Sequence, residues 1–222
     1  MSTTDVLLVA PYTPELEGLS SLLGSSLSAT VRGLRVKAVA VGIGLPMAAA
    51  GTMSRIDASR PAGVVLLGTC AAYPGRGLAT GQVVVATRML LGDAAVVAGR
   101  AAYPDPMTGQ IDTHKVLTSA LSMSTTRPVR VASPLAMTME SQLALRLSQQ
   151  LDCDVEHLEA FGVGLACAPG HVPFAAVLGV SHELGPNGRE SWRLNHRSAA
   201  HAAAQVVAAW LQSGAAGLPH TE

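Results

Sequence analysis

The sequence has few aromatic residues, few charged residues and few cysteines. Aromatic side chains make up 3% of its 222 residues, charged side chains make up 14%, and the formal net charge is zero. Without an excess of positive charge there is no long-range field to attract nucleic acid or acidic lipid, and few aromatic rings leave few platforms on which bases could stack. We therefore expect neither nucleic acid nor a membrane among the partners of this protein.

Cysteine is represented by Cys70, Cys153 and Cys167, and no two of them form a CxxC spacing. Such usage argues against the disulfide framework of a small secreted domain and is typical of a reducing compartment. The N-terminal segment MSTTDVLLVA lacks the basic residues and the long apolar run of a signal peptide. No apolar stretch approaches the roughly 20 residues that cross a bilayer. These absences predict a soluble cytoplasmic protein.

What the sequence does contain is apolar residues, at 49%, in short runs that alternate with helical patterns. Runs rich in valine, leucine and alanine predict buried strands, and the amphipathic or alanine-rich segments between them predict helices. The predicted strands cover residues 5–10, 34–44 (ending in a glycine turn), 63–72, 81–90, 129–133, 153–157 and 172–181. The predicted helices cover residues 46–59, 140–151, 158–167 and 198–212, with a further helix that starts at Pro14 after a Thr13 cap.

This alternation predicts one α/β domain over residues 1–222, with a mixed or parallel central sheet and helices on both faces. Residues 92–127 are punctuated by glycine and proline, so we expect a loop-rich insertion that forms a lid or an interface arm. The tail from Gly214 is predicted to be frayed. In a sheet of this kind, ligands bind at the carboxyl ends of the strands, which directs attention to the residues that follow each run.

Two acidic residues open predicted helices. Glu15 follows the first strand, where it is either a solvated carboxylate at a helix start or a functional group, and Glu17 is expected to point to a different face. Glu159 precedes the apolar segment AFGVGLAC, so its carboxylate needs partners inside the protein. Those partners are either the hydroxyls of a ligand or the N–H groups of its own helix.

His182 ends the run VLGVSHE, at the position where the sheet rule places a ligand site. A single histidine beside apolar sequence is either a proton donor at such a site or a packed core residue, and the residues alone favour the second reading. No set of histidine, cysteine and aspartate has the spacing of metal ligands, and there is no glycine-rich phosphate loop or GxSxG elbow. We therefore expect no metal and no cofactor.

Five segments, in order, resemble motifs of the nucleoside phosphorylase/nucleosidase superfamily. They are VLLVAPYTPELEGL, VGIGLPMAAAGT, VVLLGTCAAYPGRGLATGQVVVAT, VEHLEAFGVGLAC and VPFAAVLGVSHELG, and they cover most of the chain outside residues 92–127. Within the superfamily the chain is most similar to the branch of methylthioadenosine nucleosidase and futalosine hydrolase. The resemblance implies a futalosine hydrolase-like nucleosidase that hydrolyses the N-glycosidic bond of a purine-type nucleoside. It also implies a homo-oligomer, with a dimer favoured.

The resemblance implies roles for individual residues. Glu15 matches the acidic residue that activates the attacking water, and His182 matches the residue, usually aspartate, that donates a hydrogen bond to N7 of the purine. Because imidazole can donate a hydrogen bond and titrates near neutrality, it is able to serve the departing base. The residues implied to lie at the substrate are Thr69 beside the water, Met137, Thr138 and Phe161 at the base, and Leu158 and Glu159 at the ribose.

Two positions depart from the superfamily pattern. Leu178 stands where the hydrolases usually carry an arginine, which bears on how the water is positioned. Leu66 stands where hexameric phosphorylases carry an arginine that binds phosphate, which favours hydrolysis over phosphorolysis. Two alternatives stay open, namely a phosphate-dependent purine nucleoside phosphorylase and a nucleoside-binding protein without catalytic activity.

Overall fold

The computed structural model describes residues 4–122 and 126–219. Its strands are β1 (Val6–Ala10), β2 (Ser28–Val31), β3 (Leu34–Ala40), β4 (Gly63–Ala72), β5 (Val83–Gly92), β6 (Gln110–Asp112), β7 (Thr126–Pro134), β8 (Val155–Glu156) and β9 (Phe174–Glu183). Its helices are the 3-10 helix η1 (Thr13–Leu19) and the α-helices α1 (Ser20–Leu23), α2 (Leu45–Ser59), α3 (Ala94–Val97), α4 (Lys115–Leu121), α5 (Ser141–Leu151), α6 (Ala160–Cys167) and α7 (Gly188–Gln212).

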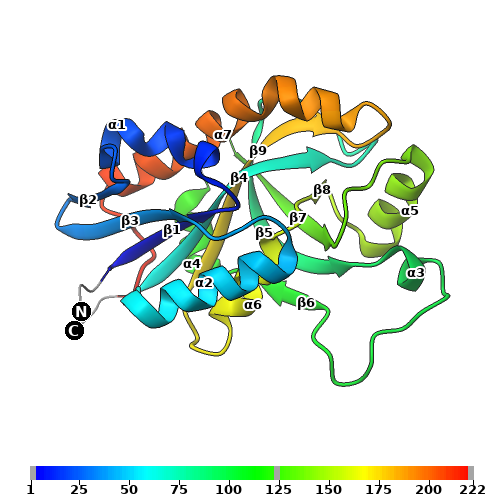
Figure 1. The fold of residues 1–222 in the computed structure, drawn as a ribbon, viewed down its shortest axis with the longest axis horizontal. Coiled ribbons are helices and arrows are strands. Elements are labelled where there is room, and N and C mark those ends of the chain that lie inside the picture. The colour runs from blue at the N-terminus through cyan, green and yellow to red at the C-terminus, as the bar shows by residue number, and fades with distance from the viewer. Residues whose placement is uncertain (1–3, 123–125, 220–222) are drawn as a thin grey trace.

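The strands of the described residues form one mixed sheet in the order β2-β3-β1-β4-β8-β7-β5-β6, and β9 pairs with both β4 and β5. The pairing of β9 joins two strands that are distant along this order, so β4, β8, β7, β5 and β9 close into a ring. Parallel pairs such as β1–β4 and β4–β9 stand beside antiparallel pairs such as β5–β9. The predicted α/β fold with a mixed central sheet is confirmed (Figure 1).

Helices cover both faces of the sheet, as the uninterrupted apolar strands require. Along β1, Val6 and Leu8 pack into a core cluster with residues of η1, α4 and α7. The alternate residues Leu7 and Val9 pack into a second cluster with residues of α2 and α6. Figure 1 shows α7, η1 and α1 on one side of the sheet and α2 and α6 on the other. The period-2 alternation of a strand therefore supplies two cores from one apolar run.

Helix boundaries differ from the sequence prediction at both ends of the chain. The last helix, α7, begins at Gly188 and not at residue 198, because its polar first turns, GRESWRLNHR, carry little of the apolar signal on which the prediction rested. At the other end, Tyr12 and not Thr13 precedes η1, and it makes no side-chain cap. None of the described helices is both long and apolar enough to span a membrane.

The tail from Gly214 packs against α7 where the structure describes it, so the prediction that it frays is corrected for residues 214–219. Ala215 is buried in the core cluster of α7, and the indole N–H of Trp210 donates to the carbonyl of Ala216 at 3.0 Å. These contacts give the tail apolar burial and a hydrogen bond, which a frayed terminus lacks. The rest of the predicted tail lies outside the described residues.

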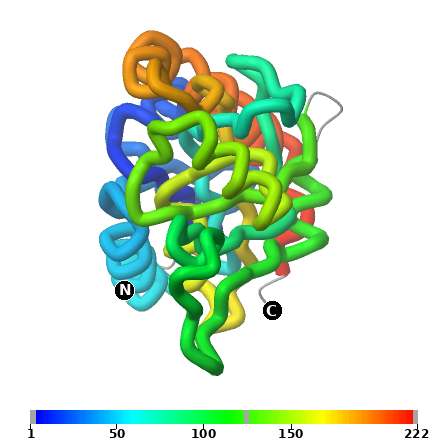
Figure 2. Tube along the Cα trace, turned by 90° about the vertical axis from the view of Figure 1, so that its right-hand side faces the viewer, coloured from blue at the N-terminus to red at the C-terminus, as the bar shows by residue number. Residues whose placement is uncertain are grey.

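The segment 92–127 contains more regular structure than its composition indicates. It holds α3, β6 and α4, and β6 pairs antiparallel with β5, with Ile111 opposite Met89. Between α3 and β6 the chain extends away from the body of the protein, at the bottom of Figure 2. Residues 123–125 of this segment lie outside the described part. A function of the segment as a lid or an interface arm stays a prediction.

Candidate active site

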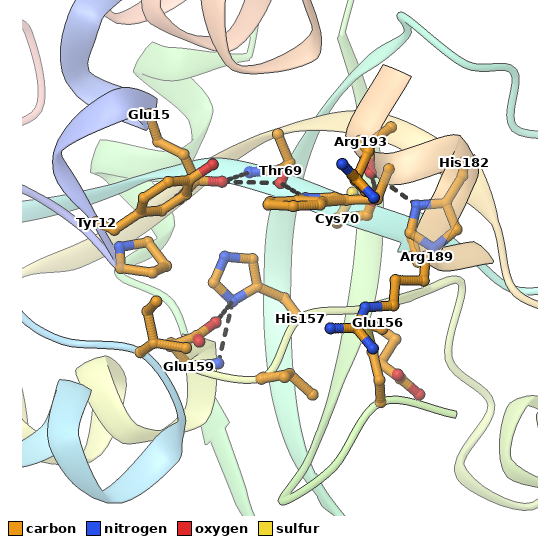
Figure 3. Close-up of a pocket in the computed structure, with 17 residues that line it drawn as sticks. Tyr12, Glu15, Thr69, Cys70, Glu156, His157, Glu159, His182, Arg189 and Arg193 are labelled. Atoms are coloured by element: carbon orange, nitrogen blue, oxygen red, sulfur yellow. Dashed lines mark hydrogen bonds and ion pairs between the residues drawn. The ribbon is translucent and has the colours of Figure 1, made fainter. Parts of the chain in front are cut away.

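A cavity of about 530 Å³ lies at the carboxyl ends of several strands, where the sheet rule predicts a ligand site. Its volume falls within the roughly 300–1,000 Å³ of small-molecule sites. Six of the eight residues predicted to form the site line this cavity, namely Glu15, Thr69, Met137, Leu158, Glu159 and His182. Figure 3 shows the labelled ones among them turned toward a common space.

The other two predicted residues, Thr138 and Phe161, are not among the lining residues. Phe161 is 2% exposed and packs in the core between the sheet and α6, so its predicted contact with a ligand is corrected. Thr138 is turned toward Glu156 and donates to its carboxylate from both the backbone N–H, at 2.9 Å, and the hydroxyl, at 2.6 Å. Tyr73 adds a third donor to Glu156 at 3.1 Å. Thr138 therefore acts on the cavity through Glu156, which lines it.

Glu15 lies in η1 and is 3% exposed, so the reading of it as a solvated carboxylate is wrong, whereas Glu17 does lie on an exposed face. The backbone N–H and the hydroxyl of Thr69 donate to its Oε1 at 2.9 and 2.8 Å. Its Oε2 is buried without a hydrogen-bond partner among the described residues. Burial raises the pKa of Glu15 to about 8, although the hydrogen bonds from Thr69 oppose this rise.

Two neighbours fix this arrangement. Gly68 leaves room for the carboxylate, because a Cβ at that position would lie 2.9 Å from Oε2 of Glu15. The indole N–H of Trp192, on α7, donates to the hydroxyl of Thr69 at 3.2 Å. The Thr69 hydroxyl therefore donates to Glu15 and accepts from Trp192. The indole packs between two rings, Tyr12 with centroids 6.3 Å apart and His196 with centroids 4.4 Å apart.

Glu159 precedes α6 and is 5% exposed, but its side chain does not cap the helix. Its Oε1 instead accepts a hydrogen bond of 2.7 Å from the backbone N–H of Gly44. Gly44 stands before α2 with a φ of 86°, which glycine adopts without strain. His157 lies on the other side, with its Nδ1 3.2 Å from Oε2. Of the two readings of Glu159, helix capping is wrong, and the carboxylate is held across the cavity from Glu15.

His182 reaches the cavity through a bulge at the end of β9. Cys70 pairs with Val180 but the next residue, Ala71, pairs with His182, so Ser181 is an extra residue in the strand. The hydroxyl of Ser181 donates to the carbonyl of Cys70 at 3.0 Å and contacts Nδ1 of His182 at 2.9 Å. Because that hydroxyl has a single proton, Nδ1 must carry the proton of the second contact. Burial lowers the pKa of His182, so neutral His182 has an unprotonated Nε2.

Several lining residues were missed from the sequence, above all Arg189, Trp192 and Arg193. Arg189 and Arg193 are one helical turn apart on α7, and no salt bridge joins either of them to another side chain in the described part of the chain. In Figure 3 the side chain of Arg189 starts below His182, and its guanidinium lies beside Glu156. Residues four apart lie on the same face only in a helix. Because the sequence predicts that this helix starts at residue 198, the spacing of the two arginines is not recognised as a signal.

A model of the Phosphorylase superfamily matches residues 14–212. The structure is similar to a futalosine hydrolase mutant of Helicobacter pylori, with a TM-score of 0.86 and 13% identity over 95% of this chain and 100% of that one. It is also similar to the 5′-methylthioadenosine/S-adenosylhomocysteine nucleosidase of the same organism, solved with butyl-thio-DADMe-Immucillin-A, with a TM-score of 0.86 and 14% identity over 95% and 99% of the two chains.

The corresponding nucleosidase of Neisseria meningitidis, in complex with methylthio-immucillin-A, has a TM-score of 0.83 and 20% identity over 95% of this chain and 99% of that one. At these identities the likeness establishes the fold. No curated protein sequence is significantly similar to this chain.

Proposed function

This chain belongs to the Phosphorylase superfamily, and from that premise we propose that it is a nucleosidase that hydrolyses the N-glycosidic bond of a purine-type nucleoside, in the manner of a futalosine hydrolase. The observation that carries the proposal is the convergence of Glu15, Glu159 and His182 on one cavity of nucleoside size. These residues come from η1, from the start of α6 and from the end of β9, so no local structural need brings them together.

The three groups suit the separate needs of the reaction. The oxygen of water bonds to C1′ of the sugar while the C1′–N bond breaks and its electron pair leaves with the base. Glu15 takes a proton from the water, and Glu159 accepts hydrogen bonds from the ribose hydroxyls. His182, in its protonated form, donates to a nitrogen of the leaving base and offsets the negative charge that develops there. The products are the free base and the free sugar.

Arg189 supports the same end of the reaction. Its side chain starts below His182, its guanidinium lies at the cavity beside Glu156, and no salt bridge joins it to a carboxylate of the described residues. A fixed positive charge there stabilises a departing base that carries negative charge. We therefore expect the His182 side of the cavity to hold the base and the Glu159 side to hold the ribose.

Phosphorolysis is the nearest alternative within the same fold. It needs cationic groups that hold phosphate where water would otherwise attack. Leu66, at the position where hexameric phosphorylases carry an arginine that binds phosphate, is fully buried in the apolar core. It cannot bind phosphate, which supports hydrolysis.

The variant Glu15→Gln tests the proposal. The amide keeps the shape of the side chain and an oxygen for the two hydrogen bonds from Thr69, but it cannot accept a proton from water. We expect release of base to fall by about 100-fold or more while the Kd for nucleoside changes little. Glu17→Gln, on the exposed face of the same helix, is the matched control. A wild-type protein that binds nucleosides without releasing base would instead establish the non-catalytic binding protein.

A further inference from the structure

His157 occupies the floor of the cavity, although nothing in the sequence distinguished it. It follows β8, its side chain is 1% exposed, and it lines the cavity between Glu156 and Glu159. Figure 3 shows its imidazole standing upright in the space, with Nδ1 turned toward Glu159 and the opposite edge of the ring turned toward the side of the cavity that holds Tyr12, Glu15 and Thr69. The backbone on either side is held in place, because its N–H donates to Ala132 and its carbonyl accepts from Ser133 at 2.6 Å.

The hydrogen bonds of His157 determine which of its nitrogens carries a proton. The backbone N–H of Glu159 donates to Nδ1 at 3.2 Å, so Nδ1 must present a lone pair. Burial lowers the pKa of His157, which keeps the ring neutral near pH 7. A neutral imidazole whose Nδ1 accepts carries its proton on Nε2. Nδ1 cannot at the same time donate to Oε2 of Glu159, so that oxygen is left for hydroxyls of a ligand.

The neighbouring groups leave a place for this Nε2–H. Oε2 of Glu15 is buried against Gly68 and has no hydrogen-bond partner among the described residues, so the carboxylate keeps a free acceptor for a water proton. Such a water also needs a donor to fix its oxygen, and the hydroxyl of Thr69 is not free, because it donates to Glu15 and accepts from Trp192. Leu178 offers no polar atom. The donors that remain on this side are the hydroxyl of Tyr12, which is buried without a partner among the described residues, and Nε2–H of His157.

We propose that His157 is a further catalytic residue, whose Nε2–H donates a hydrogen bond to the oxygen of the attacking water while Glu15 takes one of that water's protons. This rests on the proposed hydrolysis and extends it. The water oxygen then uses one lone pair toward His157 and directs the other at C1′. His157 is the better of the two donors, because the N–H of Glu159 fixes its ring whereas the hydroxyl of Tyr12 rotates freely.

Two substitutions separate the roles of the two ring nitrogens. In His157→Gln the longer amide places an N–H near the position of Nε2, whereas in His157→Asn the shorter amide keeps an acceptor for the N–H of Glu159 and offers nothing at Nε2. We expect kcat for base release to fall about tenfold or more in His157→Asn, with KM little changed, and to recover at least partly in His157→Gln. His171→Asn, on the exposed surface, is the matched control.

Competition between nucleophiles gives a readout that a purely structural role would not move. Methanol added to the reaction traps the sugar as the methyl glycoside, and the ratio of methyl glycoside to free sugar measures how strongly the site favours water. We expect this ratio to rise several-fold in His157→Asn, because the anchored water is lost, and to stay near the wild-type value in His157→Gln and in Tyr12→Phe.

The outcomes are distinguishable. If the wild-type protein releases no base, the proposed function fails and this inference fails with it. If the wild-type protein hydrolyses nucleosides but both His157 variants keep its kcat and its product ratio, only the role of His157 is overturned. A change of the ratio in Tyr12→Phe and not in His157→Asn would assign the donor to Tyr12. An effect of His157→Asn on KM alone would assign His157 to the ribose.

Discussion

At the scale of single residues, the protonation states of Glu15 and His182 that hydrolysis needs are the opposite of those that burial favours. Hydrolysis needs Glu15 ionised and His182 protonated, whereas burial raises the pKa of Glu15 to about 8 and lowers that of His182. Between these two pKa values the free protein holds one proton on the pair, mostly on Glu15. The productive form carries the same proton on His182. The rate is therefore expected to follow a bell-shaped pH profile, with the basic limb set by Glu15.

The variant His182→Asn tests this assignment. Asparagine donates a hydrogen bond without taking up a proton, so the variant needs only an ionised Glu15. We expect kcat/KM for base release to drop about 10- to 100-fold at its maximum. Its pH profile is expected to lose the fall on the basic side and to rise through a pKa of about 8 to a plateau. Rates measured from about pH 5 to about pH 10 give the profile. A variant that keeps the bell shape would remove His182 from the mechanism.

Residue identity and strand position single out Glu15, Glu159 and His182 as candidates, and the resemblance to the superfamily implies their roles at a substrate. Identity and position were not enough to place Phe161, because a side chain beside a site residue on a helix points along another face and here enters the core. Nor could they identify His157 or Tyr12 as lining residues. The sequence also does not show which polar atoms at the site lack a hydrogen-bond partner. That depends on contacts that form only in the folded chain, such as the hydrogen bond from Trp192 to Thr69 and the one from the backbone of Glu159 to His157.

At the scale of elements, the close packing of α7 on β9 orients both the histidine and the arginines. Gly179 of β9 lies directly under α7, and a Cβ there would overlap the carbonyl oxygen of Ala199. Two residues further along the strand the bulge at Ser181 turns His182 into the cavity. The same helix presents Arg189 and Trp192 from its first turns. A displacement of α7 would therefore alter two features together, namely the surroundings of His182, where the base is proposed to leave, and the hydrogen bond from Trp192 to Thr69.

We expect Gly179→Ala to destabilise the protein by about 1–3 kcal/mol, because the methyl group forces α7 away from β9. Thermal unfolding measures this loss. The control is Gly185→Ala, where a Cβ would lie 3.4 Å from the hydroxyl of Ser141 and meets no backbone. If Gly179→Ala unfolds at the wild-type temperature and the control does not, the packing of α7 described above is wrong.

Strands were easier to predict than helix starts, for a physical reason. A strand such as β4 is buried on both faces, so its whole length is apolar and its bounds coincide with the run GVVLLGTCAA. The first turns of α7 face the cavity and solvent, and their polar residues give no amphipathic pattern. Likewise β6 is a three-residue strand whose existence depends on pairing with β5, which the local sequence cannot report.

At the scale of the whole molecule, the site exists because the ring of strands brings β4, β8 and β9 together at one end. The sequence predicts the fold class. It does not predict that β9 closes the ring, because closure depends on the pairing of β9 with both β4 and β5. Two exposed large apolar side chains, Ile43 and Met137, line the cavity. The homo-oligomer, with a dimer favoured, stays a prediction. An exposed apolar surface is compatible with it.

The central claim is that water, held between Glu15 and the sugar, breaks an N-glycosidic bond in this cavity. It is tested most directly by incubating the protein with a panel of purine-type nucleosides, with and without phosphate, and identifying the base and sugar products. We predict release of base at a rate that does not depend on phosphate, with the free sugar as the second product. Strict dependence on phosphate with formation of the sugar 1-phosphate, or no release of base from any nucleoside, would contradict the account.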